Sequence, residues 1–95
     1  MTITITISRV DIERGIRCDA GSCPAALALN RVLGKGCHSS VGKDWVYLFA
    51  DDRPPLRIAI PAALRAFVVD FDTLRPCRPF AFDLDIPAEW IGGDA

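Results

Sequence analysis

Residues 2–8 read Thr-Ile-Thr-Ile-Thr-Ile-Ser, and this strict alternation of β-branched residues is the clearest indication of a strand in the chain. Successive side chains of a strand point to opposite faces. Ile3, Ile5 and Ile7 are therefore expected to face a core, and the threonines between them to face water or an edge partner. Residues 80–86 alternate in the same way, with alanine and aspartate on the outer side, and predict a last strand.

Two helices are expected, each begun by a proline at its first position, where the missing N–H is not needed. The first covers residues 24–33 and is apolar nearly all round, which predicts burial on more than one side. The second begins at Pro61 and carries an apolar stripe with the spacing of a helix, formed by Leu64, Phe67, Val68 and Phe71. Asp70 and Asp72 oppose the helix dipole at its end and predict fraying there.

Shorter elements are predicted between these segments. Residues 12–17 suit a short helical turn capped by Asp11. Residues 37–42 suggest a weak strand, 45–49 a strong one, and 56–60 a short one after a loop at 51–55. Residues 1–95 are thus expected to form one α+β domain. Its expected core is a small, mostly antiparallel sheet of about four to five strands, with two helices packed on one face.

Composition excludes several classes of protein. The chain is 51% hydrophobic and 24% charged, with a net charge of −1, so it lacks the basic footprint that duplex nucleic acid requires. It has no apolar run of about 18 residues and no signal-peptide pattern, which predicts a cytoplasmic protein without membrane contact. In a reducing compartment the four cysteines are expected to be thiols or metal ligands.

Three segments resemble a group of small phage and bacterial proteins that share Gly-x-Arg, Cys-Pro-x-Ala-Leu-Ala-Leu and Pro-Phe-x-Phe motifs. They are Ile12-Glu-Arg-Gly-Ile-Arg17, Cys23-Pro-Ala-Ala-Leu-Ala-Leu29 and Phe71-Asp-Thr-Leu-Arg-Pro-Cys-Arg-Pro-Phe-Ala-Phe82. The resemblance implies a mobile-element origin. Small phage proteins of this size commonly bind host proteins or sequester nucleotide signals of antiviral defence. The resemblance therefore suggests an inhibitor of host defence in the host cytoplasm, and a homo-oligomer is expected. Because the sequence has no recognisable catalytic motif, neither enzyme activity nor a cofactor is expected.

The loop before the first helix is the leading candidate site. A helix N-terminus attracts anions, Arg17 adds a charged donor, and Gly21 and Ser22 allow the backbone to approach a ligand. Arg17, Gly21, Ser22 and Cys23 are therefore predicted to bind a nucleotide-type small molecule. The competing interpretation is that Ser22 merely caps the helix and Arg17 is solvated.

Two further interpretations concern the cysteines. Zinc needs four ligands, and the chain offers Cys18, Cys23, Cys37, His38 and Cys77, but without paired Cys-x₂-Cys spacing; isolated thiols are favoured and no metal is expected. A thiol-dependent hydrolase would use Cys23 as nucleophile, with His38 as its base. Nothing in the sequence brings these two residues together.

The last candidates lie on strands. Asp83 and Asp85 alternate with core residues and are expected to form a solvated face that discourages edge pairing, as an alternative to acid–base chemistry with Asp70 and Asp72. A protein-only inhibitor would bind a host enzyme through the edge of the N-terminal strand. It would otherwise bind through an aromatic face anchored by Trp45, Tyr47 and Trp90.

Overall fold

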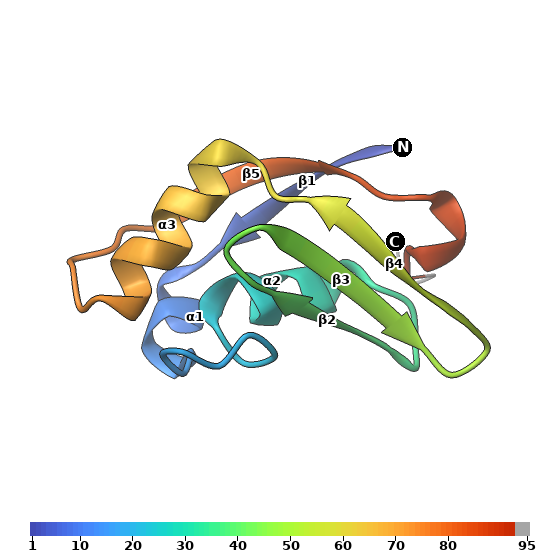
Figure 1. Cartoon of the computed structure of the whole chain (residues 1–95), viewed down its shortest axis with the longest axis horizontal. Coiled ribbons are helices and arrows are strands. Elements are labelled where there is room, and N and C mark those ends of the chain that lie inside the picture. The colour runs from blue at the N-terminus through green and yellow to red at the C-terminus, as the bar shows by residue number, and fades with distance from the viewer. Residues whose placement is uncertain (93–95) are drawn as a thin grey trace.

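The computed structural model describes residues 1–92, whose strands form two antiparallel sheets (Figure 1). One sheet pairs β1 (Thr2–Ile7) with β5 (Phe80–Asp85). The other has the order β2-β3-β4, and its strands are β2 (Cys37–Val41), β3 (Trp45–Ala50) and β4 (Arg53–Ala59). The helices are α1 (Arg9–Arg14), α2 (Pro24–Val32), α3 (Ala62–Asp72) and a 3₁₀ turn, η1 (Ala88–Trp90). The predicted α+β class is confirmed.

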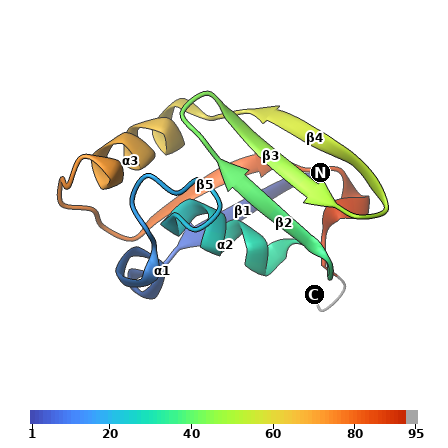
Figure 2. The ribbon, with the colours of Figure 1, turned by 60° about the horizontal axis from the view of Figure 1, so that its bottom comes forward.

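The sequence had suggested one sheet with both helices on one face. In the structure the strands instead form two sheets, and the helices do not share one face. Helix α2 lies between the two sheets, in contact with β1 on one side and β2 on the other (Figures 1 and 2). Its apolar surface explains this arrangement. Pro24, Ala25, Ala26, Ala28 and Leu29 are all buried, and a helix that is apolar all round needs partners on two sides.

The alternation in β1 and β5 determines which way their side chains point. Ile5 is paired with Phe82 and Ile7 with Phe80, on the side of the core. On the other side, all six side chains are exposed, and their pairs are Thr2 with Asp85, Thr4 with Asp83, and Thr6 with Ala81. We call these six residues the Thr–Asp face. The solvated outer face predicted from the sequence is confirmed.

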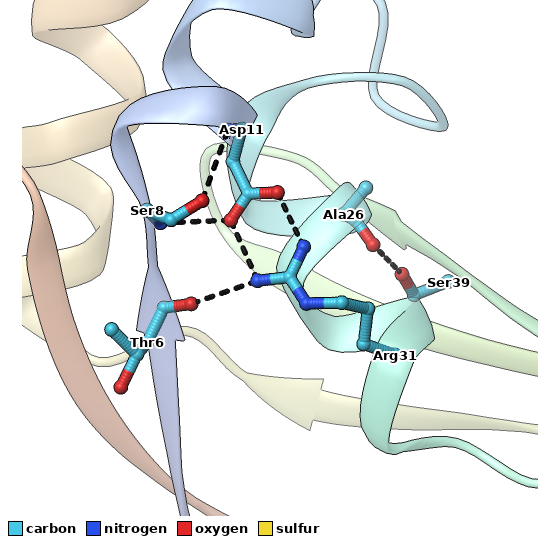
Figure 3. Close-up of polar contacts among 6 residues, drawn as sticks. All are labelled: Thr6, Ser8, Asp11, Ala26, Arg31 and Ser39. Carbon is cyan, nitrogen blue, oxygen red and sulfur yellow. Dashed lines mark hydrogen bonds and ion pairs between the residues drawn. The ribbon is translucent and has the colours of Figure 1, made fainter.

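The short helix α1 is held by a polar network that was not predicted from the sequence (Figure 3). Ser8, and not Asp11, is the N-cap: Ser8 accepts from the Asp11 N–H, and the Asp11 carboxylate accepts from the Ser8 N–H at 2.8 Å. Arg31 of α2 donates to both oxygens of the Asp11 carboxylate, and at 3.1 Å to the Thr6 carbonyl. The Asp11 side chain is only 4% exposed, so this pair fastens α1 and β1 to α2.

Gly15 at the end of α1 lies against the first residue of α2. A Cβ at this position would overlap the Pro24 ring and lie 2.8 Å from the Pro24 nitrogen. Gly15 and Pro24, which belong to two separate segments of the sequence, therefore meet in space. The glycine is needed here for close packing.

Two element boundaries differ from the prediction. Strand β4 begins at Arg53 and runs through Pro54 and Pro55, which the sequence had placed in a loop. Proline is tolerated there because β4 is an edge strand and its register with β3 shifts between Leu48 and Ala50. Pro61 is the N-cap of α3 and not its first residue, and the helix continues to Asp72.

Candidate binding surface

The loop that precedes α2 is closed on itself by backbone hydrogen bonds. The Ser22 N–H donates to the Asp19 carbonyl at 3.1 Å, and the Ser22 carbonyl accepts from Ile16 at 2.9 Å. The Gly21 N–H donates to the Asp19 side chain at 3.1 Å. Ser22 does not cap the helix: the N-cap is Cys23, whose side chain makes no capping bond within residues 1–92.

The Cys23 thiol occupies the beginning of α2 and is 3% exposed. Burial raises its pKa and outweighs the N–H groups of Ala26 and Ala25, which favour the thiolate. His38 lies on the opposite side of its sheet: the next residue, Ser39, is buried and donates to Asn30 and Ala26 of α2, so His38 points outward. The nucleophile and base that a thiol hydrolase needs are thus on different faces.

A cavity of about 320 Å³ lies beside this loop, and one part of the predicted site borders it. Its lining consists of Cys18, Asp19, Ala20, Cys23, Val41, Gly42, Lys43, Val68 and Asp72. The Cys18 backbone is left-handed, with φ 58°, and its N–H donates to Asp72 at 3.0 Å. Cys23 is therefore brought to the cavity, whereas Arg17, Gly21 and Ser22 are outside its lining. The charged groups in the lining are one ammonium and two carboxylates.

Of the other cysteines, Cys18 lines the same cavity as Cys23, whereas Cys37 and Cys77 lie outside its lining. Cys18 is exposed and Cys37 and Cys77 are half-buried. Over residues 1–92, no group of three or more His, Cys, Asp or Glu side chains is placed to hold a metal ion.

The four aspartates do not form one site. Asp83 accepts from the Thr4 hydroxyl at 2.6 Å, and Asp85 from the N-terminal ammonium at 2.9 Å, both on the Thr–Asp face. Asp72 holds the Cys18 backbone, and Asp70 is 4.0 Å from Arg75. Each carboxylate thus has a local structural contact.

The outer side of the three-stranded sheet carries a row of aromatic rings. On β3, Val46 and Leu48 are fully buried against the core, so Trp45, Tyr47 and Phe49 point the other way. Strand β2 adds His38 and Ser40, which are paired with Phe49 and Tyr47, and β4 adds Arg57 and Ala59, which are paired with Tyr47 and Trp45. We call these seven residues the aromatic face. Helix α2 packs against the opposite side of this sheet (Figure 2).

The rings of this face are aligned with one another. Tyr47 and Phe49 are 6.2 Å apart between centroids with an angle of 18° between planes, and His38 stacks on Phe49 at 5.1 Å and 21°. The guanidinium of Arg57 lies 4.0 Å from the centre of the Trp45 ring, a cation–π contact. Trp45 is 36% exposed and Tyr47 and Phe49 are half-buried, so the rings remain accessible from outside.

One predicted anchor is elsewhere. Trp90 is 3% exposed and belongs to the core, where Arg53 lies 4.8 Å from its ring centre. Trp45 and Tyr47 were expected as anchors, whereas Phe49, His38 and Arg57 were missed. The period-2 pattern of residues 45–49 contained the missing signal, since it puts three aromatic rings on one side of one strand.

Comparison of the chain with protein-family models, with curated proteins and with solved structures finds no match to any of them. No helix among residues 1–92 is long and apolar enough to cross a membrane; the longest, α3, has 11 residues.

Proposed function

We propose that this chain is a non-catalytic binding protein that uses the aromatic face as its contact surface. The observation that carries the proposal is the row of Trp45, Tyr47 and Phe49 on the solvent side of a sheet whose other side already supplies the core. Trp, Tyr and Arg are the residues that most often dominate binding energy at interfaces. The aromatic face presents each of these three residue types, Arg being represented by Arg57.

These rings lie outside the hydrophobic core. Val46 and Leu48 are 0% exposed and fill the inner side of β3. The Thr–Asp face shows that threonine and aspartate side chains are sufficient for an outer sheet face that only has to be solvated. Rings in place of threonines expose apolar area to water, a cost that a bound partner removes.

The resemblance to small phage and bacterial proteins supports a partner that belongs to host antiviral defence, met in the host cytoplasm by a homo-oligomer of this chain. Inhibition would be stoichiometric, because each bound copy of this protein would block or sequester one molecule of the host-defence component. The edge of β1 is an alternative contact for a protein partner, since β1 pairs with β5 on one side only within the described residues.

The proposal is tested by comparing the two outer faces directly. A tagged wild-type protein is used to capture host components beside a variant that combines Trp45→Leu, Tyr47→Leu and Phe49→Leu, which keeps apolar bulk but removes the rings. The matched control combines Thr2→Ala, Thr4→Ala and Thr6→Ala on the other sheet. A component retained by the control and lost by the leucine variant supports the proposal. Equal retention by both variants, or no component above background with the wild type, overturns it.

A second candidate function is sequestration of a nucleotide-type signal in the cavity beside the loop. The cavity of about 320 Å³ and its Lys43 favour it, whereas Asp19 and Asp72 oppose a phosphate group. The test is thermal unfolding with a panel of cyclic and ADP-ribose nucleotides. A shift that Lys43→Ala removes and Asp19→Asn enlarges would support this candidate. No shift at ligand concentrations far above micromolar would exclude it.

The thiol-hydrolase alternative has less support. A nucleophilic cysteine needs a lowered pKa and a nearby base, but burial raises the pKa of Cys23 and His38 points out of the opposite face. Cys23→Ser is expected to leave binding by the aromatic face unchanged.

A further inference from the structure

The aromatic face contains a row of rings along one strand, and the spacing of the rings limits what can bind there. Trp45, Tyr47 and Phe49 occupy alternate positions of one strand, so neighbouring side chains are roughly 6.8 Å apart along the sheet; the Tyr47 and Phe49 ring centres are 6.2 Å apart. Sites for small molecules are concave, whereas this surface is the open side of a three-stranded sheet (Figure 2). A row of evenly spaced rings therefore suits an extended polymer that has one flat group per repeat.

Aromatic rings stack on other π systems, so the repeating group of the bound polymer is expected to have a π face. Nucleobases of single strands stack on aromatic side chains and on arginine planes. The aromatic face carries both kinds of group, although the Arg57 guanidinium covers one face of the Trp45 ring and His38 covers one face of the Phe49 ring. Bases inside a duplex are already stacked on each other, so they do not reach such rings.

The two outer faces differ in the carboxylates that they carry. The seven residues of the aromatic face include no carboxylate, although the whole chain has a net charge of −1. The turns that flank β3 carry Asp44, Asp51 and Asp52. Asp44 lies 3.9 Å from Arg65, and Asp52 lies 3.1 Å from Arg53. The Thr–Asp face, in contrast, includes two carboxylates: Asp85 is paired with the N-terminal ammonium at 2.9 Å, and, within residues 1–92, Asp83 accepts only from the uncharged Thr4 hydroxyl.

We infer that the occupant of the aromatic face is a single-stranded nucleic acid, held by base stacking on Trp45, Tyr47 and Phe49. This inference rests on the proposed function. Few cations lie near the rings, so stacking supplies most of the affinity and phosphate contacts supply a small part. Binding is accordingly tolerant of sequence, because every base has a π face.

The test is titration with a single-stranded oligothymidylate of about eight nucleotides, within the range that one small domain covers. Tryptophan fluorescence reports the surface, since Trp90 is buried in the core and Trp45 is exposed. Anisotropy of a labelled oligonucleotide measures the affinity, and a duplex of the same length is titrated in parallel. Saturable binding of the single strand, with quenching of fluorescence and a weaker response to the duplex, is expected.

Single substitutions test whether the oligonucleotide binds at the aromatic face. Tyr47→Leu and Phe49→Leu should each weaken it at least about five-fold, as expected for the loss of one stacked base. Arg57→Gln should reduce the dependence of log K on log salt by about 0.7, the value for one phosphate on a single strand. Thr4→Ala on the other sheet is the matched control and should change nothing. If one leucine variant fails to fold by circular dichroism, the other and Arg57→Gln test the same surface.

Three results would overturn the inference: no binding at millimolar oligonucleotide, equal affinity for the duplex, or equal losses with Thr4→Ala and Phe49→Leu. Nuclease treatment in the capture experiment separates this failure from failure of the proposed function. Capture that depends on the aromatic face and survives nuclease shows a protein occupant, so the function stands and the inference falls. Capture that does not depend on the aromatic face would contradict both the proposed function and this inference.

Discussion

The two sheets of this protein have inner faces of the same kind and outer faces of different kinds. Both bury aliphatic residues inward, Ile5 and Leu84 in one sheet and Val46 and Leu48 in the other. Outward, the β1–β5 sheet shows threonine and aspartate, whereas the β2–β3–β4 sheet shows aromatic rings with an arginine and a histidine. The proposed function rests on this difference, because the β1–β5 sheet shows that an outer face of this domain can be solvated without aromatic rings.

The largest expected effect compares two neighbours on opposite sides of β3. Leu48 is fully buried and Phe49 is half-buried. Leu48→Ala should lower the free energy of unfolding by about 2–5 kcal/mol through lost burial and a cavity. Phe49→Ala should lower it by about 1 kcal/mol or less, the value of surface cross-strand contacts. Denaturant unfolding measures both, and equal losses would make the aromatic face a structural surface.

A smaller effect is expected at the network that fastens β1 to the helices. Arg31→Ala leaves the buried Asp11 carboxylate without its main partner and should cost about 1–3 kcal/mol. Arg31→Lys, which keeps the charge, should cost less. Chemical denaturation of the two variants side by side measures the difference, and an equal loss in both would show that the ion pair contributes little.

The same network predicts a pH dependence. The hydrogen bond from Arg31 holds the pKa of Asp11 below its usual value, despite burial. The folded state therefore binds fewer protons at Asp11 than the unfolded state, and the stabilisation is complete above about pH 4, the unfolded pKa. It is lost as pH falls through the lower folded pKa. Unfolding measured from pH 6 to pH 2 should show a loss that Asp11→Asn lacks.

The contact between Arg57 and Trp45 should contribute about 0.5–1 kcal/mol, because both groups are exposed. Arg57→Gln removes the charge and keeps much of the length. A double-mutant cycle with Trp45→Leu isolates the pair, and no coupling between the two substitutions would show that the arginine is free for a partner.

The smallest effect is expected on the Thr–Asp face. Thr4→Ala removes the 2.6 Å hydrogen bond to Asp83, but both groups are in water, so the change should be about 0.5 kcal/mol or less. Thermal unfolding of this variant provides the baseline for the comparison of the faces. A loss above about 1 kcal/mol would mean that this face, too, has a structural role.

Sequence patterns predicted the faces of this fold better than its pairings. The alternation in residues 2–7 and 80–85 identified the outer threonines and aspartates, and the all-round apolar surface of α2 predicted burial on two sides. The two-sheet arrangement was missed, because a local sequence pattern does not show that the first strand pairs with the last. The contact of Arg31 with Asp11 was missed for the same reason, although Ser8-x-x-Asp11 was a readable capping box.

The candidate surface, too, contains residues that could be predicted from the sequence and residues that could not. Trp45 and Tyr47 were predicted as anchors from residue type alone. Their neighbours His38 and Arg57 come from other strands and follow only from the register of the sheet. The loop around Cys23 carried the pattern of an anion site, but whether its N–H groups are free depends on the folded backbone, and there the loop donates to its own Asp19.

The central claim is that the two outer faces differ in what they bind, and mapping of amide chemical shifts by NMR tests it most directly. The protein is titrated with the single-stranded oligothymidylate while every assigned amide is followed. Our account predicts shifts concentrated in residues 38–40, 45–49 and 57–59, with β1 and β5 unchanged. Shifts centred on β1 and β5, or spread evenly over both sheets, would contradict it.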